Sequence, residues 1–176
     1  MTRDHHFFYD TSLGRGTVVY GQEGIKRHLL PTTAKNIVEK ALISYDSKFL
    51  NEGRLRTLLE SYFSGREINK WEAYLDTSGY SLFKLKVFET VGRISYGEVR
   101  SYKEVACEIG IPNGARAVGM AMRENRHPLL IPCHRVIASN KKLGGWSGPP
   151  ELKSRLLSIE GNLVNEGMRI SNELSF

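Results

Sequence analysis

The sequence predicts an α+β protein in two parts: a small N-terminal α+β domain and a C-terminal helical domain that contains a helix-turn-helix. Strand-like runs followed by helical periodicity occupy the N-terminal part. Two short helices with capping signals and a tight turn follow in the second half. Residues 129–137 then place a cysteine and a histidine side by side between two apolar runs, which favours a rigid, buried position for both.

The composition is ordinary for a globular protein, with 176 residues, 40% of them apolar and 25% charged. There is no long apolar run and no basic, apolar leader, so we expect neither a membrane span nor a signal peptide. This favours a cytoplasmic location, or a nuclear one in a eukaryote. The chain has two cysteines, which are too few for a disulfide framework and suit a reducing compartment with a free thiol.

The positive charge is concentrated in the second half of the chain. The net charge is +1 over residues 1–81, +6 over residues 82–162 and −1 over residues 163–176. A basic half indicates a polyanionic partner, most often nucleic acid, although a solvated basic face without a partner has the same composition.

The N-terminal elements are two strands followed by two helices. Glycine-bounded residues 14–21 and residues 25–30 are rich in β-branched or apolar side chains and predict strands. Apolar residues recur at helical spacing over residues 35–45 and 51–63, and Gly65 ends the second of these helices.

The polar, turn-rich residues 72–81 mark a domain boundary, which divides the chain into residues 1–78 and 79–176. His5, His6 and His28 lie in the first part without cysteines or carboxylates at ligand spacing, so we expect no metal site.

The first helix of the C-terminal domain is predicted over residues 82–91, with Ser81 as its N-cap and Gly92 at its end. Three of its apolar side chains are expected to face inward: Leu82, Leu85 and Phe88.

Ser101 and Glu104 form a capping box, which starts a second helix at Tyr102 that stops at Gly110. Asn113 is expected to cap a third helix over residues 114–124. Two short helices with this turn indicate a helix-turn-helix, although an αα-hairpin of the core would carry the same caps. Most side chains on the third helix are small or slender, which favours close approach to another backbone and leaves Arg116 as the large side chain that can intrude. The small or slender residues are Gly114, Ala115, Ala117, Gly119, Met120 and Ala121.

The glycine-rich residues 139–150 contain one large aromatic side chain, Trp146. This segment either walls a pocket or forms a surface hairpin with Trp146 packed on the core. Apolar residues at helical spacing then predict a last helix that ends at Glu160 and Gly161, followed by a strand within residues 163–170.

The central cysteine is best understood with its neighbours. A lone cysteine in an apolar run is most often an inert core residue. However, Pro132-Cys133-His134-Arg135-Val136, preceded by isoleucine, resembles the active-site signature of the O6-alkylguanine-DNA alkyltransferases. Residues 94–102, 115–119 and 121–125 are also similar to that family, and the resemblance extends in order and spacing over roughly residues 55–162. It implies a ribonuclease H-like N-terminal domain and a winged-helix-like C-terminal domain.

The resemblance implies direct DNA repair, in which an alkyl group moves irreversibly from O6-alkylguanine, and from O4-alkylthymine, to a cysteine of the protein in a single turnover. Cys133 would accept the alkyl group, His134 would be its base through a bound water, and Glu160 would orient the histidine. The implied partner is double-stranded DNA with an alkylated guanine, and the protein would act as a monomer without a cofactor.

The resemblance also assigns residues to the DNA and to the base pocket. Arg116 would fill the stack after the nucleotide is flipped out, and Tyr102 would crowd the target phosphate and donate a proton to the leaving guanine. The helix would enter the minor groove. Further DNA contacts would come from Ser101, Ala115, Gly119 and Arg123. The pocket would be formed by Asn125, Val136, Trp146 and Ser147.

The chain departs from the common family pattern at three places. Trp146 replaces a frequent tyrosine, Pro149-Pro150 replaces a more flexible run, and Met120 stands where a second glycine is frequent. The first two bear on pocket width and the third on the approach of DNA.

Two other classes of function fit parts of the sequence. One is a non-catalytic helix-turn-helix DNA binder, either a regulator or a lesion flag, but lesion flags of this family lack the acceptor cysteine that is present at Cys133. The other is a cysteine hydrolase built on Cys133, His134 and Glu160, for which the sequence shows no separate oxyanion motif.

Overall fold

The computed structural model describes residues 4–32, 50–68, 71, 73–144, 146 and 148–171. It consists of two compact units, Met1–Ser78 with Arg126–Pro128, and Gly79–Asn125 with Leu129–Phe176. Helices and strands both occur, which confirms the predicted mixture. The helix predicted over residues 35–45 lies outside the described residues. No helix in the described ranges has the length and apolar character needed to cross a membrane.

The first unit is built on an antiparallel sheet with the order β1-β2-β3. Strand β2 (Gly14–Gly21) is confirmed, and β3 (Gly24–Thr32) extends the predicted strand in both directions. Strand β1 (His5–Thr11) was not predicted, although Phe7 and Tyr9 are both buried and alternate with side chains that are less so.

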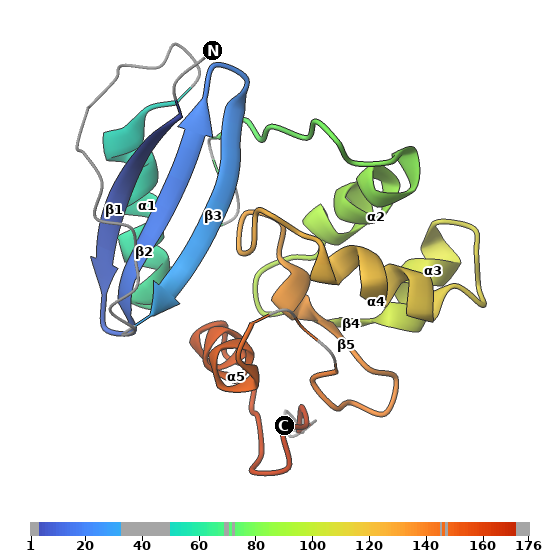
Figure 1. The fold of residues 1–176 in the computed structure, drawn as a ribbon. Helices are drawn as coiled ribbons and strands as arrows, with labels where there is room; N and C mark the ends of the chain where they lie inside the picture. The colour runs from blue at the N-terminus through green and yellow to red at the C-terminus, as the bar shows by residue number, and fades with distance from the viewer. Residues whose placement is uncertain are drawn as a thin grey trace. The chain divides into compact units, whose positions relative to one another are not determined.

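Helix α1 (Glu52–Phe63) lies along one face of this sheet (Figure 1). It was predicted one residue longer, because Asn51 is its N-cap and accepts a hydrogen bond from the Arg54 amide at 2.9 Å. Its buried side chains include Phe63, whose ring stacks with that of Tyr9 at a centroid distance of 6.0 Å.

The chain returns to the first unit for three residues, Arg126–Pro128. The backbone amide of His28 donates to the Arg126 carbonyl at 2.8 Å, and the His28 ring bonds to the Pro128 carbonyl at 2.6 Å. The ring of His127 bonds to the Ile25 carbonyl at 2.8 Å. Strand β3 therefore fixes the segment that precedes residues 129–137, the Cys-His stretch, in the sequence.

In the second unit, α2 (Leu82–Gly92) has the predicted N-cap, since Ser81 accepts from the Lys84 amide at 3.3 Å. The prediction that Leu82 faces inward is wrong, because Leu82 is 85% exposed. The buried stripe runs through Val87, Phe88 and Val91. Leu82 precedes Val91 by about two and a half helical turns, so it lies on the opposite face.

Helix α3 (Tyr102–Glu108) begins with the predicted capping box: Ser101 accepts from the Glu104 amide at 3.1 Å, and Glu104 accepts from the Ser101 amide at 2.6 Å. Just before it, β4 (Arg100–Ser101) pairs in parallel with β5 (Val136–Ile137). This ladder places the start of α3 beside the end of the Cys-His stretch.

Helix α4 (Ala115–Arg123) begins after Gly114, and the predicted cap by Asn113 is wrong. The Gly114 amide donates to the Ile111 carbonyl at 2.6 Å, so the turn closes at Gly114, one residue after the predicted cap. A Cβ atom at this position would lie 2.3 Å from the Ile111 side chain, so only glycine fits the N-cap.

Helix α5 (Pro150–Ile159) starts with proline, which is favoured in the first helical turn. Pro149 and Pro150 therefore form the start of a helix. Glu160 is the C-cap, and Gly161 follows with a φ of +85°, as the predicted stop requires. The strand predicted within residues 163–170 is reduced, among the described residues, to isolated bridges between Lys142 and Arg169 and between Val164 and Ile170.

Candidate active site

Cys133 opens a short 3₁₀ turn, η1 (Cys133–Arg135), in which all three residues are buried. The apolar runs on both sides are buried as well, which confirms the expected buried setting. The Cys133 amide donates to the Ile131 carbonyl at 2.7 Å, and the Arg135 amide donates to the Pro132 carbonyl at 2.9 Å. These bonds fix the backbone on which the thiol is mounted.

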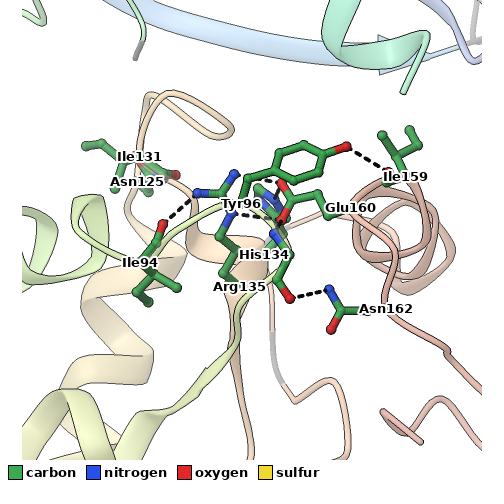
Figure 2. Close-up of polar contacts among 10 residues, drawn as sticks. Ile94, Tyr96, Asn125, Ile131, His134, Arg135, Ile159, Glu160 and Asn162 are labelled. Carbon is green, nitrogen blue, oxygen red and sulfur yellow. Dashed lines mark hydrogen bonds and ion pairs between the residues drawn. The ribbon is translucent and has the colours of Figure 1, made fainter. Parts of the chain in front are cut away.

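Glu160 joins His134 and Arg135 in one buried network, which Figure 2 shows. The Nε2 atom of His134 lies 2.8 Å from Oε1 of Glu160. Arg135 donates from Nε to Oε2 and from one terminal nitrogen, Nη2, to Oε1, both at 2.8 Å. A third donor of Arg135 reaches the Ile94 carbonyl at 2.7 Å. The carboxylate is therefore held by a bidentate arginine while it pairs with the imidazole.

These contacts determine the charge of both partners. Burial raises the pKa of Glu160, but the hydrogen bonds from His134 and Arg135 outweigh that effect and lower the pKa to about 2. The group is therefore a carboxylate. Burial lowers the pKa of His134, and the carboxylate opposes that effect. Because the Nε2–H group donates to Glu160, the other ring nitrogen, Nδ1, carries the lone pair that can accept a proton.

The loop before β4 completes the support of Glu160. The Gly97 amide donates to Oε2 of Glu160 at 3.3 Å, and Asn162 donates to the Gly97 carbonyl at 3.2 Å. Gly97 has a φ of +79°, and a Cβ atom there would lie 3.1 Å from the Glu160 carbonyl oxygen. The Tyr96 hydroxyl donates to the Ile159 carbonyl at 2.8 Å (Figure 2). The end of α5 is thus attached to this loop.

The thiol of Cys133 has a hydrogen-bond donor of its own. The indole Nε1 of Trp146 lies 3.2 Å from Sγ. Burial raises the pKa of the thiol, while the bonds from Trp146 and Asn125 lower it. Asn125 also donates to the Ile131 carbonyl at 3.1 Å (Figure 2), which connects the segment after α4 to the Cys-His stretch.

Tyr102 and Lys153 add two more groups around the thiol. Burial, and then the charge of Cys133, raise the pKa of Tyr102 to about 12, so its phenol stays protonated at neutral pH. Lys153 is fully buried and donates to the carbonyls of Val136 at 2.7 Å and Leu143 at 2.6 Å. Its ammonium lies 5.8 Å from the centre of the Tyr102 ring. Burial lowers the pKa of Lys153 to about 8.

The predicted residues thus fall into two groups. Hydrogen bonds or charge interactions connect most of the proposed catalytic and pocket residues: Cys133, His134, Glu160, Tyr102, Asn125, Val136 and Trp146. Ser147 lies outside the described residues. On the helix pair, Arg116 and Arg123 are exposed, whereas Ser101, Ala115 and Gly119 are half-buried. A Cβ atom at Gly119 would make an ordinary contact of 3.9 Å with the Tyr102 ring, so this position of α4 lies beside Tyr102.

Three supporting residues were not assigned a role from the sequence. Arg135 lies within residues 132–136, but that local sequence does not indicate its distant partner. Lys153 precedes Leu156 and Glu160 at helical spacing, so a lysine on a buried stripe was a usable signal. Gly97 follows the turn residues of the loop, but its contact with Glu160 depends on the tertiary fold. Within the described ranges, no three histidine, cysteine or acidic residues are grouped to hold a metal.

Fold and site together are those expected of a thiol-dependent enzyme: a buried cysteine and a carboxylate-held histidine follow a helix pair in the sequence. A family model described as the DNA-binding domain of 6-O-methylguanine DNA methyltransferase matches residues 82–162. The methylated-DNA–protein-cysteine methyltransferase of Sulfurisphaera tokodaii is 45% identical over 103 residues, which is 58% of this chain and 64% of that protein. That of Methanosarcina acetivorans is 32% identical over 158 residues, 90% of this chain and 99% of that protein. The chain belongs to the family of methylated-DNA–protein-cysteine methyltransferases.

Solved structures agree with this membership. A variant of the Mycobacterium tuberculosis O6-methylguanine methyltransferase is similar with a TM-score of 0.71 and 30% identity, over 98% of each chain. The M. tuberculosis OGT in complex with DNA is similar with a TM-score of 0.72 and 31% identity, over 89% of this chain and 92% of that one.

Proposed function

We propose that this protein repairs DNA by moving an alkyl group from the O6 atom of guanine to Sγ of Cys133, irreversibly and once per molecule. The observation that carries this proposal is a buried thiol that accepts a hydrogen bond from Trp146 and precedes a histidine held by Glu160. Family membership supports the same chemistry. O4-alkylthymine is a second substrate, because it presents an alkyl carbon on an exocyclic oxygen in the same way.

The reaction begins with removal of the thiol proton. His134 takes it at Nδ1 through a bound water, and the resulting imidazolium is stabilised by the Glu160 carboxylate. The thiolate then attacks the alkyl carbon, so that a carbon–sulfur bond forms as the carbon–O6 bond breaks.

The leaving guanine needs a proton to avoid departure as an anion. Tyr102 is the proposed donor, since its phenol is protonated at neutral pH and its charge couples to that of Cys133. Solvent then returns the proton from His134 to Tyr102, so the net result is an S-alkyl cysteine and an unmodified guanine. A thioether has no carbonyl that water could attack, so the thiol is not regenerated and the activity ends after one transfer.

The target atom lies inside the base stack, so the nucleotide must be rotated out of the duplex. Arg116 is exposed in the first turn of α4 and is proposed to occupy the vacated position. Helix α4 is proposed to bind the minor groove, with phosphate and groove contacts from Ser101, Tyr102, Ala115, Gly119 and Arg123. Binding should therefore weaken with added salt and depend little on base sequence.

The remaining details of the proposal concern the pocket and the domains. Asn125 braces the Cys-His stretch, Ser147 hydrogen-bonds the O6 side of the base, and the backbone of Cys133 and Val136 reads its exocyclic amine. The first unit is proposed to be ribonuclease H-like and the second winged-helix-like. The protein is proposed to act as a monomer without a cofactor, and its cytoplasmic location stays a prediction.

The direct test is the intact mass of the protein after incubation with a duplex that carries one O6-methylguanine, followed by peptide mapping. We expect a stoichiometric gain of one methyl group on Cys133 and no turnover. Replacement of the exposed second cysteine, C107A, is the matched control and should leave the gain unchanged.

The variant C133A should bind the duplex but gain no mass. A C133A protein that still accepts a methyl group would disprove the assignment of the nucleophile. Duplex binding by the unmodified chain without any mass gain would instead support a lesion flag or a regulator, and turnover of an ester would support a hydrolase.

A further inference from the structure

The indole of Trp146 contacts the reacting atom of the site. Its Nε1 atom lies 3.2 Å from Sγ of Cys133. An indole N–H group donates a hydrogen bond and cannot accept one, so it stabilises the thiolate and cannot take the thiol proton. The proton must leave toward another group, which separates the role of Trp146 from that of His134.

We propose that Trp146 is a catalytic residue whose indole N–H activates Cys133 by hydrogen-bonding to the thiolate that attacks the alkyl carbon. This inference rests on the proposed function and names the group that makes its nucleophile reactive. Because Cys133 is only 1% exposed, bulk solvent does not surround its negative charge, and a donor from the protein must help to stabilise it.

The loop is shaped to hold the indole in this place. A Cβ atom at Gly148 would lie 2.8 Å from the six-membered ring of Trp146, so the ring rests directly on the glycine backbone. The variant G148A should therefore displace the indole without removing it. This gives a second way to break the contact with the thiol.

Other titratable groups also face the thiol, and they must be held constant in any test. Tyr102 from α3 and Lys153 from α5 interact electrostatically with Cys133, and His134 is its neighbour in η1. The variants W146F and G148A retain all three groups. A difference between them and the parent protein therefore reports on the indole.

Transfer should also be visible at Trp146 itself. A neutral thioether is a weaker acceptor than a thiolate, so alkylation weakens the hydrogen bond and changes the surroundings of the indole. The chain has two tryptophans, Trp71 and Trp146, so a W71F background leaves Trp146 as the single tryptophan, which is excited selectively at wavelengths that tyrosine does not absorb. Measured before incubation and again after the duplex has been removed, its fluorescence should change on methylation of Cys133 and stay constant in a C133A protein treated in the same way.

The test measures thiol reactivity in a C107A background as a function of pH. The probe is methyl methanethiosulfonate, which converts the thiolate to a methyl disulfide and releases methanesulfinate. We expect W146F and G148A to react about tenfold or more slowly than the parent protein at neutral pH, because one pKa unit is one factor of ten in thiolate concentration. The rates should converge as the pH rises past the midpoint of thiol titration. Methyl transfer from the duplex should show the same shift.

A structural role for Trp146 would give a different result. Equal rates in all proteins, or a rate ratio that is constant with pH, would overturn the proposal, as would an unchanged emission of Trp146 on methylation. Failure of the proposed function is distinguishable: the parent protein would take no methyl group from the duplex, yet W146F would still shift the titration of the thiol with the small reagent.

Discussion

Each unit of the protein contains a fully buried histidine, and the two have opposite surroundings. In the first unit, His28 bonds through Nδ1 to the Pro128 carbonyl at 2.6 Å and through Nε2 to the Tyr9 hydroxyl at 2.8 Å. In the second unit, His134 bonds through Nε2 to the Glu160 carboxylate at 2.8 Å. Both side chains are almost completely removed from water.

The charge of the partner separates His28 from His134, the proposed catalytic base. His28 donates to a carbonyl and accepts from a phenol, so both ring nitrogens are satisfied in the neutral state, and burial lowers its pKa to about 4. A proton added to His28 would have no counter-charge. His134 faces a carboxylate that stays ionised, so it can hold a proton in transit. Burial alone therefore does not identify a catalytic histidine.

The largest effect is expected from the variant E160Q, which removes the charge that distinguishes His134 from His28. It leaves Arg135 buried without its ion pair, which should lower the free energy of unfolding by about 3–5 kcal/mol. Loss of the oriented base should slow methyl transfer by about 10²-fold. Urea unfolding and single-turnover transfer from an O6-methylguanine duplex measure the two effects.

The exposed Glu151, in the first turn of α5, provides the control. The variant E151Q should change both quantities very little. If E160Q transferred the methyl group at a rate within twofold of the parent rate, His134 would work without its carboxylate. The contrast with His28 would then have no chemical meaning.

A smaller effect is expected from acid, and it belongs to His28. Its pKa falls from 6.5 to about 4 on folding, so the unfolded chain binds the proton first as the pH drops. Stability is fully retained above the unfolded value and is lost as the pH falls through the interval to the folded value. The loss attributable to His28 is about 3 kcal/mol in total. Unfolding free energies measured across this interval check the slope.

The variant H28Q removes this titration and should make the acid slope shallower. The burial-lowered pKa values of His127 and His134 act in the same direction and remain in the variant. Methyl transfer at neutral pH should not change. A slower transfer in H28Q would mean that the segment fixed by β3 affects the Cys-His stretch that follows it.

Local signals in the sequence predicted much of the second unit. Caps and stops depend on a few neighbouring residues, so the Ser81 cap, the capping box at Ser101 and the stop at Gly161 were all correct. Glu160 was placed at the end of its helix for the same reason. The alternation that identifies β1 was present as well, but two histidines at its start obscured it.

Features that depend on distant partners could not be predicted. The role of Arg135 requires Glu160 and Ile94, which are far from it in the sequence. Leu82 was assigned to the core because it is apolar, but only the packing of α2 decides which face is covered. The hydrogen bond that Trp146 donates to Cys133 also depends on tertiary structure, because thirteen positions separate the two residues in the sequence.

The smallest effect is expected from Y9F, which removes one of the two hydrogen bonds of His28 and keeps the ring. A neutral hydrogen bond contributes about 1 kcal/mol, and an unsatisfied buried acceptor adds to the loss. We therefore expect a decrease of about 1–2 kcal/mol in the unfolding free energy with no change in transfer rate. Y74F is the control, because Tyr74 is 68% exposed. A changed transfer rate in Y9F would place His28 in the reaction and break the distinction between the two histidines.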